Sequence, residues 1–141
     1  MGPSAIALVK ESRGWVVPMA EQAADIFYER FFSTAPELRP LFKGDIKEQG
    51  RKLMATIAIV VNSLDRLDHV LPAVRALAVR HESYGVRDED YDAVGAALIW
   101  TLAVGLGDRF TEAHRAAWIE IYGALSSIMR EAASKKQTAA E

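Results

Sequence analysis

The sequence predicts an all-α fold, and two observations carry that prediction. Apolar residues recur at intervals of three and four, which places them on one side of a helix, as with Ala20, Ala24 and Phe27. No stretch of useful length alternates with period two, and dense β-branching, the usual strand signal, is confined to residues 57–61 inside a helical frame. Short breakers cut the chain into six or seven helical segments joined by short loops.

Each expected helix starts beside a residue that caps or opens a helix, and each stops at a breaker. The expected segments run from Ser4 to Val17, from Pro18 to the break at 33–36, from Pro36 to Phe42, from Asp45 to Ser63, from Pro72 to Gly85, from Asp88 to the turn at 105–108, and from Thr111 through Ile128. The tail 134–141 has no apolar face, so we expect it to be frayed.

Length and composition indicate one globular domain, 1–141, rather than a disordered chain. Half of the 141 residues are hydrophobic and 26% are charged. The net charge of −2 is spread along the chain, so no electrostatic footprint for nucleic acid is present. The sequence has no cysteine, which excludes disulfides, thiolate catalysis, thiolate metal ligation and thioether attachment of a cofactor.

The sequence also predicts a cytoplasmic protein without a membrane span. Lys10, Glu11 and Arg13 follow the N-terminus too closely to leave the apolar core of a signal peptide. The longest uncharged apolar run, 93–107, is shorter than the ~18 residues that a membrane-spanning helix needs.

The three histidines differ in their surroundings. His69 and His114 lie among charged or polar neighbours, and we expect both to be exposed. His81 lies near a helix end, four residues after Leu77 and four before Gly85. One ring nitrogen of a neutral imidazole could ligate a metal while the other donates to a carbonyl such as that of Leu77. The alternative is a helix-end histidine stabilised by the macrodipole, which periodicity alone favours.

Two further polar residues bear on this choice. Tyr28 lies between apolar neighbours, so its hydroxyl needs a buried partner unless it reaches the surface. Gln49 begins an apolar helix face that continues with Leu53, although it could be an ordinary exposed glutamine. Together with His81 and Phe42, these side chains would form an apolar cleft with few polar groups, which is the usual form of a cofactor site.

The segment FYERFFSTAPELRPLF, residues 27–42, resembles the second and third helices of bacterial globins of the flavohaemoglobin class, which includes the single-domain Vitreoscilla-type haemoglobins. Further pieces fall at the spacings of that family, namely Gln49 to Leu53, His81 to Val86, Tyr91, and residues 118–123. The resemblance covers roughly residues 6–129. It implies a globin fold, a three-over-three helical sandwich whose D helix is short or absent.

The resemblance also implies a role for each matching residue. His81 would be the proximal ligand of the iron of a non-covalent haem b, and Phe42 would pack against the porphyrin. Tyr28 would direct its hydroxyl at a distal ligand, beside Gln49 in the distal position and Leu53 one turn later. The remaining residues expected to line the haem site are Leu77, Val86 and Tyr91.

The function implied by the resemblance is reversible binding of O₂, and also of NO and CO, at the open sixth position of a histidine-ligated haem iron. It would serve O₂ transport or storage, or NO detoxification. Flavohaemoglobins continue into a reductase, whereas this sequence ends at Glu141, so we expect a separate reductase to supply electrons. The alternatives are a haem-based gas sensor and a haem-free globin-like regulator.

One departure from the family pattern concerns the proximal side. The family commonly places a glutamate in the last helix that, with a tyrosine matching Tyr91, bonds the proximal imidazole. Spacing from Tyr122 puts Ala133 at that position, and the nearest acid, Glu131, lies ~200° around the helix. This departure implies that the proximal imidazole donates less electron density to the iron, which makes peroxidase-like chemistry less favourable.

Overall fold

The computed structural model describes the backbone of residues 3–42, 44–66, 68, 71–76, 78 and 88–140. Within these ranges it describes the side chains of residues 4–40, 42, 44–66, 68, 71–76, 78 and 89–131. This part of the chain is helical and contains no strand, so the predicted all-α class is confirmed.

The described elements follow the predicted order. They are α1 (Pro3–Val16), the 3₁₀ turn η1 (Val17–Met19), α2 (Ala20–Thr34), η2 (Pro36–Leu41), α3 (Ile46–Asn62), η3 (Leu64–Arg66), α5 (Asp88–Leu106), η4 (Gly107–Arg109) and α6 (Glu112–Ala140). Residues 71–76 are also helical.

Two helix boundaries have clear local causes. Asp45 caps α3 as predicted, because its Oδ1 accepts a hydrogen bond from the Lys47 backbone N–H at 2.9 Å. α6 continues to Ala140, and the frayed state expected for the tail 134–141 remains a prediction. The alanine, lysine and glutamine side chains of this segment favour helix, which accounts for the continuation.

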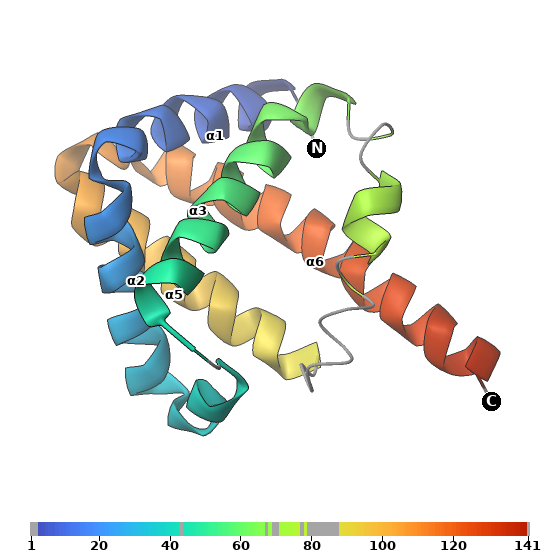
Figure 1. Cartoon of the computed structure of the whole chain (residues 1–141). Coiled ribbons are helices and arrows are strands. Elements are labelled where there is room, and N and C mark those ends of the chain that lie inside the picture. Colours follow the sequence, from blue (N-terminus) through green and yellow to red (C-terminus); the bar gives the residue numbers. More distant parts are fainter. Residues whose placement is uncertain are drawn as a thin grey trace.

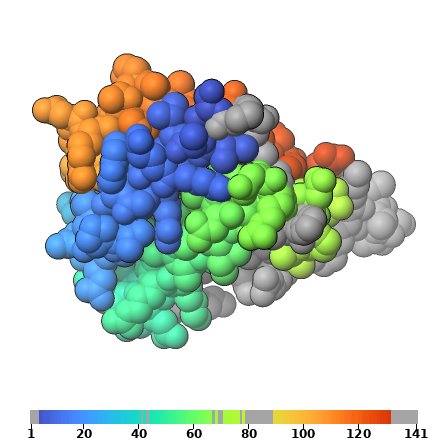
Figure 2. All heavy atoms as spheres, turned by 90° about the horizontal axis from the view of Figure 1, so that it is seen from above, coloured from blue at the N-terminus to red at the C-terminus, as the bar shows by residue number. Residues whose placement is uncertain are grey.

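The helices pack in crossing pairs rather than as a parallel bundle. α2 packs along α5 and α3, and α1 packs along α6. α3 crosses in front of α6 in the view of Figure 1. Seen from above, α1 lies between α3 and the turn that joins α5 to α6 (Figure 2). No helix in the described ranges is long and apolar enough to cross a membrane.

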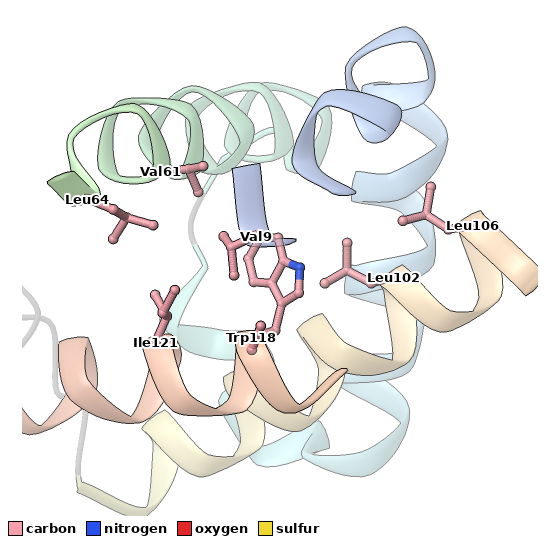
Figure 3. Packing of buried hydrophobic residues seen from close by; sticks show 8 residues of the cluster. Val9, Val61, Leu64, Leu102, Leu106, Trp118 and Ile121 are labelled. Carbon is pink, nitrogen blue, oxygen red and sulfur yellow. The ribbon is translucent and has the colours of Figure 1, made fainter. Parts of the chain in front are cut away.

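One hydrophobic core lies where α1, α3, α5 and α6 meet. Figure 3 shows Trp118 of α6 between Val9 of α1 and Leu102 of α5. The Trp118 indole N–H donates to Ser12 Oγ at 2.8 Å, and Ser12 donates in turn to the Leu8 carbonyl at 2.7 Å. The one polar atom of the indole is therefore paired inside the core, as burial requires.

The prediction that His114 is exposed is wrong, since only 5% of this residue is accessible. Its Nδ1 accepts the Thr111 backbone N–H at 3.2 Å and pairs with the Thr111 hydroxyl at 2.7 Å. Its Nε2 lies 2.8 Å from Oε1 of Glu11 on α1. The imidazole thus caps α6 and ties it to α1, between the rings of Trp15 and Phe110.

Candidate aromatic site between α2, α3 and α5

A cluster of aromatic rings gathers around Tyr28 in the middle of α2. The Tyr28 ring centroid lies 5.1 Å from that of Phe27, 5.6 Å from that of Phe32 and 5.7 Å from that of Phe42. Positions 28 and 32 are one turn apart on α2, and Phe42 returns to them because η2 reverses the chain after Thr34. The predicted meeting of Tyr28 and Phe42 is therefore present.

The Tyr28 side chain is a buried phenol. The residue is 6% exposed, and burial raises the pKa of its hydroxyl from 10.0 to about 12. Tyr28 is therefore neutral and protonated at any physiological pH. Its hydroxyl makes no hydrogen bond to the part of the chain that the structure describes. Because no described residue accepts its proton, that proton is available to a ligand.

α3 supplies the neighbouring wall of this cluster. Leu53 packs against the aromatic rings, and Gln49, half-buried, lies one turn earlier on the same helix. Between them, Gly50 allows α3 to approach α2 closely. A Cβ placed on Gly50 would lie 2.9 Å from the Cβ of Ala24 and 3.7 Å from Cε2 of Tyr28. This glycine sets the distance between the two helices, and the sequence analysis did not identify it.

Several predicted site residues lie outside the described residues. They are Leu77, His81 and Val86. His69, which we expect to be exposed, also lies outside the described residues. The metal-ligand assignment of His81 accordingly remains a prediction. In the described ranges, no group of three histidine, cysteine, aspartate or glutamate side chains could hold a metal ion.

Tyr91 lies near the start of α5 and is buried. Its backbone carbonyl accepts a hydrogen bond from the Tyr122 hydroxyl at 2.6 Å. Tyr122 reaches it across Gly95, where an added Cβ would lie 2.7 Å from Cε2 of the tyrosine. Burial of Tyr122 raises the pKa of its hydroxyl, so this phenol is also a neutral donor.

Arg130 of α6 is a further neighbour of Tyr91 that sequence reasoning missed. Its guanidinium carbon lies 5.6 Å from the centroid of the Tyr91 ring, and its Nη2 lies 2.8 Å from Asp92 Oδ1. Glu131 is exposed, and α6 is uninterrupted through Ala133, so the predicted angular offset of that carboxylate persists. No local pattern could reveal Arg130, because the fold alone brings it to Tyr91.

The arrangement suits a flat apolar cofactor with a small ligand beside it. Aromatic and aliphatic side chains of α2, α3 and α5 form the cluster, which also includes Ala93, Val94 and Leu98. A single phenol donor without a described partner lies among them. These residues fit the distal side of a haem, where a ligand would complete the hydrogen bond of Tyr28.

Comparison with known proteins identifies the family. The Globin family model matches residues 25–129. The flavohemoprotein of Bordetella parapertussis is 32% identical over 132 residues, a match that covers 92% of this chain and 33% of the relative. The flavohemoprotein of Vibrio cholerae is 32% identical over 119 residues, covering 79% of this chain and 30% of the relative. The chain thus spans about a third of the length of these relatives.

A bacterial globin of Campylobacter jejuni has the same fold. The two structures superpose with a TM-score of 0.85 at 24% sequence identity, over 97% of this chain and 99% of that one. The predicted globin architecture is thereby confirmed, and the described residues between η2 and α3 add no further helix, as the resemblance implied. On its sequence and its fold, the chain belongs to the globin family of haem-binding proteins.

Proposed function

We propose that the chain binds a non-covalent haem b beside Tyr28 and reversibly holds O₂ there. The observation that carries this proposal is the buried Tyr28 phenol, whose hydroxyl makes no hydrogen bond to the described part of the chain. Haem, when bound, supplies an iron with an open sixth position for O₂, NO or CO. The protein supplies the surroundings of that position.

The residues then divide between the two sides of the cofactor. Phe42 would pack against the haem, and Tyr28, Gln49 and Leu53 would face its ligand. His81 would ligate the iron through a ring nitrogen. The phenol proton of Tyr28 would donate a hydrogen bond to a partly negative O₂, and such a charge-assisted bond contributes about 1.5–3 kcal/mol. The apolar rings around it exclude water, which strengthens that bond.

The finer proposal is removal of NO. NO, O₂ and one electron combine to give nitrate, and the electron comes from a separate reductase. Tyr28 contributes by holding O₂ while NO arrives. The flavohemoproteins to which this chain is similar are about three times as long, which leaves room in them for a further domain. A carrier or store of O₂ is the second candidate, since it needs the same distal donor and no electron supply.

One experiment separates the two candidates. The reduced protein is equilibrated with O₂ and supplied with NO, NADH and a flavin reductase, and NO is followed with an electrode. The NO-removal proposal expects many turnovers, with nitrate as product. A single turnover followed by arrest, despite active reductase, would reject it and leave the carrier. Omitting the reductase is the control, and it should give one turnover in either case.

A further inference from the structure

Both backbone groups of Phe42 bond to one residue, Arg39. The Phe42 N–H donates to the Arg39 carbonyl at 3.1 Å, and Nη1 of Arg39 donates to the Phe42 carbonyl at 2.8 Å. These two bonds join the same residues in opposite directions. They fix the peptide groups on either side of the Phe42 side chain, and we call this pair of bonds the Arg39 clamp.

The guanidinium of Arg39 also contacts an aromatic ring of α2. Its Cζ lies 5.2 Å from the centroid of the Phe32 ring, which is within the range of a cation–π contact. A guanidinium can lie over a ring and donate a hydrogen bond at the same time, because it is flat and its N–H groups point outward in its plane. Arg39 is exposed, so these contacts, rather than core packing, hold its side chain in place.

Regular secondary structure does not fix the position of Phe42. The residue follows the end of η2 and has an extended backbone, with φ −99° and ψ 97°. Two residues later, Gly44 has a φ of 89°, a conformation that favours glycine. Within η2, Pro36 and Pro40 fix φ at two of the six positions. Arg39 therefore connects a stiff turn to a ring that lies outside any helix.

The ring that the clamp holds belongs to the aromatic cluster around Tyr28. The Phe42 centroid lies 5.3 Å from that of Phe32 and 5.7 Å from those of Tyr28 and Phe31. All three pairs meet edge to face, at interplanar angles of 75°, 85° and 74° in the order Tyr28, Phe31, Phe32. A displacement of Phe42 would therefore change the surroundings of the phenol proposed to hold O₂.

We propose that Arg39 is a positioning residue for the haem site and holds the Phe42 ring in the orientation that haem contacts. This inference rests on the proposed function, because it takes Phe42 as the ring that packs against haem. Arg39 acts through the backbone of Phe42 and the ring of Phe32. Loss of the clamp loosens the Phe42 ring, so haem leaves the protein faster.

The signals of the phenylalanine rings test the clamp without haem. The chain contains five phenylalanines, so selective ¹³C labelling of their rings gives few NMR signals. Arg39→Met removes the guanidinium from an unbranched side chain, and the signals of Phe32 and Phe42 should shift. Arg109→Met is the matched control, because the Arg109 guanidinium lies at the same distance, 5.2 Å, from the ring of Trp15, which packs against the other core. Unchanged Phe42 signals in Arg39→Met would overturn the clamp.

Dissociation of haemin tests the positioning role. The protein is loaded with haemin and mixed with an excess of apomyoglobin, and the transfer is followed in the Soret band. Arg39→Met should release haemin about three- to tenfold faster than the native protein, because it loses a charged hydrogen-bond donor and a cation–π contact. Arg109→Met should stay within about twofold of the native rate, because its contact is remote from the site.

Arg39→Lys separates the geometry of the clamp from its charge. Lysine keeps the positive charge, but it has no planar group to lie over Phe32 while it donates to the Phe42 carbonyl. Arg39→Lys should therefore still release haemin at least about twofold faster than the native protein. A native rate in Arg39→Lys or in Arg39→Met would overturn the positioning role. A native protein that takes up no haemin would refute the proposed function, while the phenylalanine signals still decide the clamp.

Discussion

At the scale of single residues, the proposed function assigns control of the O₂ dissociation rate to the hydroxyl of Tyr28. Tyr28→Phe keeps the ring among its aromatic neighbours and removes only the donor. The loss of about 1.5–3 kcal/mol should raise the O₂ dissociation rate about ten- to a hundredfold, measured by stopped flow with CO as the displacing ligand. Tyr122→Phe is the matched control, because that hydroxyl is bonded to the Tyr91 carbonyl. An unchanged rate in Tyr28→Phe would assign ligand control to Gln49 or to neither residue.

The raised pKa of Tyr28 predicts that the free energy of unfolding falls at alkaline pH. The pKa of Tyr28 in the folded protein, about 12, lies above its ordinary value of 10.0, so the native state keeps a proton that the unfolded chain releases. Stability should be constant below pH 10 on this account and should fall as the pH rises from 10 to 12. Urea unfolding of Tyr28→Phe should show a smaller decline in that window. An identical decline would mean that the phenol ionises as easily in the folded state as in the unfolded one.

The sequence predicts burial correctly where a residue's surroundings come from its own helix. Apolar neighbours in the chain predict that Tyr28 is buried, and the structure confirms it. The same reasoning fails for His114, whose neighbours are polar, because the carboxylate that pairs with it belongs to Glu11, far away in sequence. Sequence periodicity describes one helix at a time. Partners supplied by a second helix lie beyond its reach.

At the scale of elements, Gly50 sets the packing of α3 on α2. Gly50→Ala gains about 0.5–1 kcal/mol of helix propensity, but its Cβ would lie 2.9 Å from that of Ala24. Overpacking costs about 1–3 kcal/mol, so we expect a net loss of about 1–2 kcal/mol in urea unfolding. Gly123→Ala is the control, because a Cβ there meets no atom within 4 Å, and it should be stabilising. Equal stabilisation by both substitutions would show that the contact relaxes without cost.

Helix boundaries were largely predictable because caps and breakers act locally. Asp45 caps α3 through its own side chain, and the proline-rich segment after Thr34 can form only the short η2. The angular positions of Glu131 and Ala133 also follow from helix geometry, given an unbroken α6. This helix continues to Ala140. Propensity alone, without an apolar face, accounts for that extension.

At the scale of the whole molecule, the pairing of helices decides what surrounds the proposed cofactor. α5 and α6 bring Arg130 over the Tyr91 ring, with Asp92 bound to the same guanidinium. The Arg130 guanidinium lies beside Tyr91, where the family pattern predicts a carboxylate. Its position depends on a tertiary contact between helices, so no motif predicts it. The all-α class was predictable from apolar periodicity, and the globin fold from the resemblance carried mainly by residues 27–42.

The central claim is that His81 holds haem opposite Tyr28, and titration of the purified protein with haemin tests it most directly. The native protein and His69→Ala should each give a Soret band that saturates at one equivalent of haemin. His81→Ala should lose that band or shift it markedly, because the axial nitrogen is gone. A His81→Ala variant with the spectrum and affinity of the native protein would contradict the claim.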